Sequence, residues 1–168
     1  MTAQEIIELL NLQPLPKEGG FFRQSYEASE KIPLQALPPR YQQDIAFSTA
    51  IYFLLTLDNY SAMHRLITDE IFHFYLGDPV EMLLLYPEGS GEVFILGSDL
   101  QAGMRPQKLV PQGVWQGAKL AAKGKCGFAL LGTTMSPGFE WEGFELGQRG
   151  ALIEQYSNFS NLIKARTR

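Results

Sequence analysis

The chain has 168 residues, 45% of them hydrophobic, and a formal net charge of −4. This length predicts one domain with one hydrophobic core. The acidic balance and the scattered Lys and Arg residues argue against a nucleic-acid polymer as a partner. The single cysteine, Cys126, excludes a disulfide bond within the chain and a zinc site built from several cysteines.

The N-terminal sequence, MTAQEIIELL, carries acidic residues and lacks a basic segment, so we expect no signal peptide. No apolar run approaches the ~20 residues that span a bilayer, so we expect no membrane partner. A cytoplasmic protein is the resulting expectation.

Residues 1–44 are expected to form a helix, a turn and a loop ahead of the main body. Thr2 and Glu5 match a capping box, which predicts a short amphipathic helix over residues 2–11. A turn with proline and glycine, an extended aromatic segment and a proline-rich surface loop should follow, at residues 16–20, 21–26 and 31–43.

Residues 45–135 show the pattern of an antiparallel β-structure. Short runs rich in β-branched and aromatic residues are separated by turn residues at spacings of ~8–12 positions. The expected strands span residues 47–57, 61–66, 70–76, 80–86, 92–96, 107–110, 114–118 and 128–134. This spacing favours a barrel or a sandwich over alternating strands and helices.

Residues 136–168 complete the predicted single domain with a loop and a helix near residues 150–165. Apolar residues recur there at spacings of three or four, which is a helical period. They are Ile153, Tyr156, Phe159 and Ile163.

The stretch from Ser61 to Gly77 carries most of the candidate chemistry. Alternation along a strand places Glu70, Phe72 and Phe74 on one face. If the strands on either side of residues 67–69 form a hairpin, His64 faces Glu70 across it. The pair is then either a structural hydrogen bond, a catalytic or substrate-binding pair, or two ligands of a divalent metal.

His73 points to the opposite face from Glu70, where a structural role is expected. The chain contains only two histidines, His64 and His73. A metal site with three histidines is therefore impossible within one subunit.

Further residues are candidates for contact with a bound small molecule. Aromatic side chains on or beside the expected strands either pack in the core or form a stacking wall for a ring: Tyr52, Phe72, Phe74, Trp115 and Phe139. Polar residues at chain breaks are expected at a barrel mouth: Glu18, Ser61 and Glu140.

Two motifs in this order are similar to those of the cupin superfamily. The first runs from His64 through Glu70 to Gly77 with the spacing of the first cupin motif. The second begins at Pro111 and Gly113 and ends at Gln116, where the cupin motif has histidine.

The chain resembles most closely the uncharacterised cupin subfamily DUF985, or cupin-5, over nearly its full length. The matching segments are residues 18–20, 48–55, 61–79, 110–116 and 137–140. The resemblance implies an all-β fold with a few helices, namely an RmlC-like double-stranded β-helix (a jelly-roll barrel). It also implies a pocket inside the barrel and a homodimer.

Two departures from the cupin motifs bear on metal binding. Leu66 replaces the second histidine of the first motif, and Gln116 replaces the histidine of the second. A metal held by His64, Glu70 and Gln116 would be weak, because an amide oxygen is a poor ligand for a soft or borderline ion. We therefore expect no cofactor, with a weakly held divalent metal as the alternative.

The function expected from these features is binding of a small molecule, a sugar or sugar nucleotide, inside the barrel. Isomerase- or epimerase-type proton transfer would use His64 and Glu70 as catalytic groups, and Gln116 would hold a substrate oxygen. One alternative is a metal-dependent, dioxygenase-like cupin enzyme. The other is a protein that binds a small metabolite without catalysis.

Overall fold

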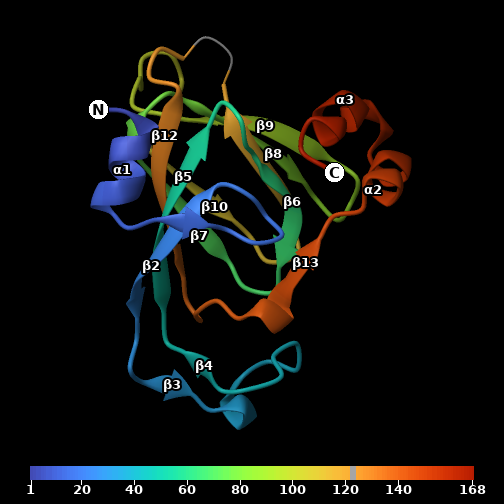
Figure 1. Ribbon diagram of the computed structural model, residues 1–168. Helices are drawn as coiled ribbons and strands as arrows, with labels where there is room; N and C mark the ends of the chain where they lie inside the picture. Colours follow the sequence, from blue (N-terminus) through green and yellow to red (C-terminus); the bar gives the residue numbers. More distant parts are fainter. Residues whose placement is uncertain (122–123) are drawn as a thin grey trace.

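Two antiparallel sheets face each other and form the body of the molecule (Figure 1). The structure is a computed structural model and describes residues 1–121 and 124–168. The larger sheet has the strand order β1 (Gln13–Pro14), β2 (Phe21–Glu27), β5 (Thr49–Thr56), β12 (Phe128–Met135), β7 (Glu70–Gly77) and β10 (Gln107–Val110). The smaller sheet has the order β13 (Phe144–Leu146), β6 (Ser61–Leu66), β11 (Trp115–Leu120), β8 (Val80–Leu85) and β9 (Gly91–Leu96).

A two-stranded ribbon extends from one end of this body (Figure 1). It pairs β3 (Lys31–Ile32) with β4 (Ile45–Ala46). The segment between them, expected as an irregular loop, contains a 3₁₀ turn, η1 (Leu34–Ala36).

The N-terminal helix covers part of the outer face of the larger sheet. Helix α1 (Ala3–Leu9) begins at the predicted capping box, in which Thr2 and Glu5 bond to each other's backbone N–H. Its buried Ile6 packs with Leu54 of β5 and Leu130 of β12. The capping prediction is confirmed.

The C-terminal segment packs against the outer face of the smaller sheet. The predicted helix is divided into α2 (Arg149–Gln155), a 3₁₀ turn η3 (Ser157–Phe159) and α3 (Ser160–Lys164). Leu152 and Ile163 bury their side chains against Met63 of β6 and Leu83 of β8. The predicted helical period is confirmed, but the predicted single helix is interrupted at residue 156.

The interior between the sheets is solid at one end and hollow at the other. Along β12, Ala129 and Leu131 belong to the apolar core, whereas Thr133 and Met135 line a cavity. These side chains share one face of the strand because alternate residues point the same way. β5 shows the same division between its core residues and its cavity residues, so a few strands build both the stable core and the cavity.

All eight expected strand regions contain strands, with differences of a few residues at their ends. The expected hairpin between β6 and β7 is wrong, because the two strands lie in different sheets. β6 pairs with β11 and β13, and β7 pairs with β10 and β12. Residues 67–69 therefore connect one sheet to the other.

Candidate functional site

A cavity of about 320 Å³ opens at the hollow end of the barrel. Both sheets contribute to its wall, together with the turn before β2 and residues 139–144. His64 and Glu70, which the sequence singled out, line it from the two sheets and are both buried. They face the same interior space across the barrel rather than across a hairpin.

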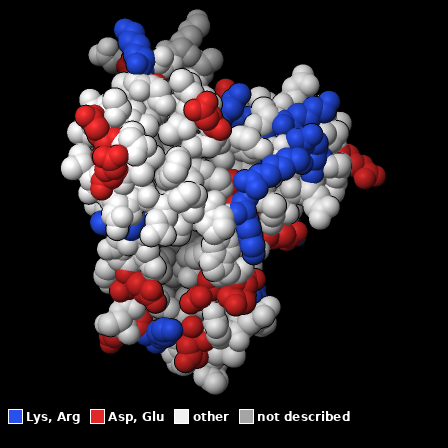
Figure 2. Space-filling model, viewed as in Figure 1, with Lys and Arg blue, Asp and Glu red and all other residues white. Residues whose placement is uncertain are grey.

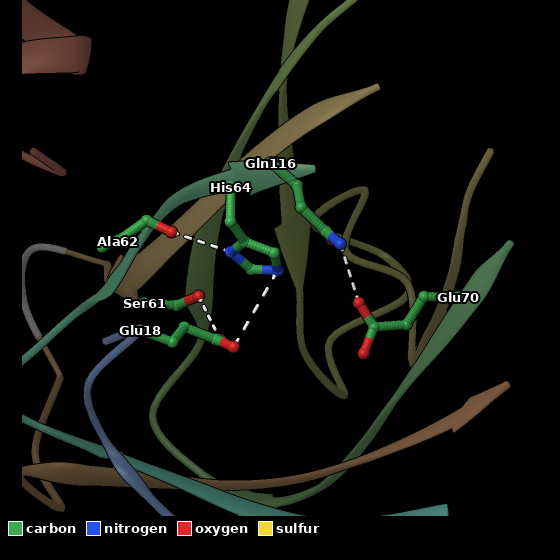
Figure 3. A network of polar contacts seen from close by, with 6 residues as sticks. All are labelled: Glu18, Ser61, Ala62, His64, Glu70 and Gln116. Carbon is green, nitrogen blue, oxygen red and sulfur yellow. Dashed lines mark hydrogen bonds and ion pairs between the residues drawn. The ribbon is translucent and has the colours of Figure 1, made fainter. Parts of the chain in front are cut away.

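The imidazole of His64 is held in one orientation by its own strand. Its Nδ1 lies 2.8 Å from the carbonyl oxygen of Ala62. Because a carbonyl can only accept, Nδ1 carries the proton and donates. In the neutral ring Nε2 is then an unprotonated acceptor, and it lies 3.9 Å from Glu18 Oε2 (Figure 3).

Glu18 is the carboxylate nearest to the imidazole, and Ser61 fixes its other oxygen. The Ser61 hydroxyl donates to Glu18 Oε1 at 2.6 Å. The Glu18 carbonyl accepts from the N–H of Ala62 at 2.9 Å. Gly19 follows with φ +103°, and a Cβ there would lie 2.5 Å from the Tyr60 carbonyl oxygen. The turn therefore needs glycine to bring Glu18 against β6.

A β-bulge allows Ser61 and His64 to reach the same carboxylate. His64 pairs with Gln116, but Ser61 pairs with Ala118, so β6 contains one extra residue between these pairs. In a regular strand, residues three positions apart would point to opposite faces. No motif in the sequence marks this bulge.

Glu70 is held in the wall opposite by Gln116. The Gln116 amide N–H donates to Glu70 Oε2 at 2.7 Å (Figure 3). Burial raises the pKa of Glu70, and the carboxylate of Glu18 raises it further, while His64 and the hydrogen bond from Gln116 act in the opposite direction. Glu70 therefore keeps its proton to higher pH than an ordinary glutamate.

Aromatic rings form one side of the cavity and its mouth. The ring of Phe144 stacks on His64, with 5.1 Å between centroids. Trp141 makes edge-to-face contacts with Phe139 and Phe144, at centroid distances of 5.1 and 5.3 Å. Edge-to-face contacts of this kind fix ring positions.

Carboxylates gather around the mouth. Glu27 and Glu140 both line the cavity. Burial raises the pKa of Glu140, and Glu142 and Glu27 add to the increase, while Lys31 opposes it. Acidic side chains cluster on the same side of the molecule, where the β3–β4 ribbon meets the barrel (Figure 2).

Comparison with known proteins decides the family. The sequence profile described as "Cupin superfamily (DUF985)" matches residues 4–147. The chain belongs to this family. The expected mostly β, double-stranded β-helix fold is thereby confirmed.

Similar proteins are known from several organisms. Protein SO0799 from Shewanella oneidensis is 34% identical, with a TM-score of 0.86, over 100% of this chain and 98% of that chain. A hypothetical protein from Leishmania major is 28% identical, with a TM-score of 0.88, over 99% of both chains. An uncharacterized protein from Saccharomyces cerevisiae is 32% identical over 97 residues, which are 56% of this chain and 48% of the yeast protein. The chain thus spans about half the length of that relative.

The structure brings together some of the other predicted binding residues in this cupin cavity. Glu18, Phe139 and Glu140 line it. Ser61 and Gln116 do not line it, but each bonds to a glutamate that does.

The remaining predicted contacts lie elsewhere. Phe72 and Phe74 belong to the apolar core. Tyr52 and Trp115 lie on the outer faces of their sheets, where Tyr52 packs near α1 and Trp115 near α2 and α3. Alternation is the reason: Tyr52 lies one residue from cavity-lining Ile51, and Trp115 one residue from Gln116.

Several lining residues were missed by the sequence analysis. Phe22 and Gln24 come from β2, Thr133 from β12, and Trp141 and Phe144 from the segment after the barrel. The alternation of Phe22 with Gln24 was a usable signal for β2. The position of residues 141–144 depends on β13 pairing with β6, which only the tertiary structure reveals.

The side chains at the cupin ligand positions do not fit a transition metal. The apolar Leu66 lines the cavity beside His64. Gln116 directs an N–H toward Glu70, and its side chain does not line the cavity. In residues 1–121 and 124–168, no group of three His, Cys, Asp or Glu side chains is placed to hold a metal.

His73 lies on the outer face of the larger sheet, as alternation predicts. Its Nε2 lies 2.9 Å from the Thr134 hydroxyl, and its Nδ1 lies 3.3 Å from the amide of Gln107. Burial lowers the pKa of His73. In the described part of the chain, no helix is long and apolar enough to cross a membrane.

Proposed function

We propose that this cupin binds a small polyhydroxylated molecule in the barrel and moves a proton on it. One observation carries the proposal: a buried imidazole with a fixed tautomer presents Nε2 to a cavity that Glu70 also lines. A base and a carboxylic acid that keep different protonation states are the requirement for general acid–base catalysis.

The proposed reaction is isomerisation or epimerisation of a sugar. Nε2 of His64 takes the proton from a carbon next to a carbonyl group. Protonated Glu70 donates to the carbonyl oxygen, which forms an enediol, and the proton then returns to a carbon. The step needs no oxidant and no cofactor. Glu18 stabilises the protonated imidazole by charge.

Isotope exchange tests this function. Candidate sugars are incubated with the protein in D₂O, and replacement of the C–H next to the carbonyl is followed by NMR. We expect exchange with the native chain and loss of about 10²-fold or more in rate with His64→Ala, the usual size for a positioned acid–base group.

His73→Ala is the matched control, because it removes the other histidine of the chain and lies outside the cavity. The proposal fails if His64→Ala exchanges every accepted sugar as fast as the native chain. Crystals of protein purified without added ligand would identify the natural ligand by its electron density.

Two further expectations stay proposals. A binding protein without catalysis would retain its ligand in the same cavity but show no exchange. Self-association as a homodimer is also proposed, and a solution mass of one chain would contradict it.

A further inference from the structure

The cavity has an unbalanced charge. Four glutamates line it: Glu18, Glu27, Glu70 and Glu140. Along the described wall there is no Lys or Arg to compensate them. Carboxylates that crowd one another without a cation raise the cost of their own ionisation.

The cations near the mouth lie outside the cavity lining. Lys31 of the β3–β4 ribbon lowers the pKa of Glu140, whereas Glu142 in η2 (Trp141–Gly143) raises it. Lys17 places its ammonium 5.1 Å from the ring centroid of Trp141. Both lysines are exposed. Lys31 therefore offsets part of the repulsion at Glu140, and neither lysine lines the cavity.

The polar atom that His64 presents to the cavity is an acceptor. Nδ1 of His64 is already used as a donor to Ala62, so Nε2 accepts. Its nearest charged neighbour is Glu18 Oε2 at 3.9 Å, a distance that leaves both atoms without a hydrogen bond to each other. His64 is only 2% exposed, yet it lines the cavity. A buried acceptor directed into a hollow favours a ligand that brings donors.

The aromatic wall suits a cation as well. Phe22, Phe139, Trp141 and Phe144 all line the cavity. Ring faces attract ammonium groups, and Trp141 already does so with Lys17. Carboxylates combined with aromatic faces are therefore a matched environment for a positively charged nitrogen.

We propose that the barrel cavity selects ligands that carry a protonated primary amine, placed between Glu18 and the aromatic wall, beside His64. The inference deepens the proposed function and rests on it, because it assigns the charge of a ligand in the same site. The volume of about 320 Å³ is at the small end for ligand pockets and suits one ring. Phosphorylated sugars and sugar nucleotides are disfavoured, because their negative charges would face the carboxylates of the cavity wall, such as Glu18 and Glu27, with no Lys or Arg in the described lining.

Binding of charge-matched probes tests the inference. One set is D-glucosamine, D-glucose and D-glucose 6-phosphate, and the other is benzylamine, benzyl alcohol and benzoate. Affinities are measured by calorimetry on the full chain, and protein NMR locates binding. In at least one set we expect the amine to bind about tenfold more tightly than the neutral member, with the anion weakest.

Variants assign the preference to the cavity. Glu18→Gln is expected to remove most of the tenfold preference, measured as the ratio of the amine's affinity to the neutral probe's affinity in the same variant. Glu154→Gln, an exposed carboxylate on α2, is the matched control and should change neither. If Glu18→Gln does not fold by circular dichroism, Glu140→Gln at the mouth replaces it, with a smaller expected loss.

The inference is overturned if the neutral or anionic member binds as tightly as the amine in both sets, or if no amine binds in the cavity. It is also overturned if the preference survives in both glutamate variants. A neutral sugar that shows His64-dependent proton exchange without any preference for amines would leave the proposed function standing and remove only this inference.

Discussion

The carbonyl of Ala62 decides which nitrogen of His64 faces the cavity. Without this acceptor both tautomers of the neutral ring would be available, and Nε2 would not be fixed as the base. The two carboxyl groups beside this imidazole have different partners. Glu18 accepts a hydrogen bond from the Ser61 hydroxyl, and Glu70 on the opposite wall accepts one from the Gln116 amide.

Glu70 has a stability consequence that can be measured. Burial, followed by the charge of Glu18, raises its pKa above 4.5 in the folded chain, although His64 and Gln116 oppose the increase. Between 4.5 and the raised pKa the folded state binds more protons than the unfolded state. This carboxyl therefore makes the free energy of unfolding fall as the pH rises through that window.

Glu70→Gln should flatten this dependence and increase stability at the upper end of the window. Urea unfolding at pH values spaced upward from 4.5 checks the expectation, with Glu154→Gln as the exposed control. Identical pH slopes for the native chain and Glu70→Gln would show that burial of this carboxyl carries no cost.

For single residues, the sequence predicted the orientation of a side chain correctly where the pattern within one strand was enough to decide it. Alternation within β7 put His73 on the opposite face from Glu70, whereas His64 was expected to face Glu70 across a hairpin that the structure does not contain. It did not find the pairing of Glu18 with His64, because that contact joins a turn to a bulged strand 43 residues away along the chain at Ser61. The sequence analysis did not predict that Thr133 lines the cavity. A threonine that points inward near the end of a strand cannot be distinguished, from sequence alone, from a threonine that packs beside the core.

At the scale of elements, Asp78 joins the end of β7 to the start of β12. Its buried carboxylate accepts backbone N–H bonds from Lys125, Cys126 and Gly127 at 2.7 to 3.0 Å. Burial alone would raise the pKa of Asp78, but these bonds outweigh it and lower the pKa. The contribution to stability is therefore present at neutral pH and is lost as the pH falls through the lowered pKa.

Asp78→Asn should destabilise the fold by about 1–3 kcal/mol at neutral pH, because a neutral amide oxygen replaces a carboxylate that accepts several backbone bonds. The loss should shrink in acid, where the native aspartate is protonated as well. Urea denaturation at neutral and acidic pH measures both, and Asp58→Asn in the exposed turn after β5 provides the control. A loss that does not depend on pH would contradict the role of the charge.

The elements themselves were largely predictable from turn residues and β-branched runs. The exceptions were short strands such as β1, β4 and β13, which have two or three residues. Such strands carry too little pattern to be recognised locally. They form because a neighbouring strand offers free backbone groups.

On the scale of the whole molecule, Arg166 anchors the C-terminal segment to the smaller sheet. Its guanidinium is fully buried and donates to Glu81 Oε1 of β8 at 2.5 Å. Its carbonyl accepts from the N–H of Met63 in β6. Gly117 of β11 leaves space at this contact, since a Cβ there would lie 2.6 Å from Met63 Sδ and 3.2 Å from Arg166 Cδ.

Arg166→Met should cost about 1–3 kcal/mol, because the half-buried Glu81 carboxylate loses the charged donor that it accepts from. Combining it with Glu81→Gln should recover part of that loss. Chemical denaturation measures both, and Arg168→Met, at an exposed position, is the control. The anchoring role would be disproved if the single Arg166→Met variant were as stable as the control.

The sequence by itself determined the class of fold, the strand positions and the opposite orientations of Glu70 and His73, because alternation and turn chemistry act over a few neighbouring residues. It also determined, through the cupin motifs, that Leu66 and Gln116 stand where metal ligands are expected. Only the tertiary structure decided that β6 and β7 lie in different sheets, that a bulge turns Ser61 and His64 toward Glu18, and that four glutamates share one cavity. Those features depend on pairing between segments far apart in the chain, and the free energy of such pairing is not encoded in any local pattern.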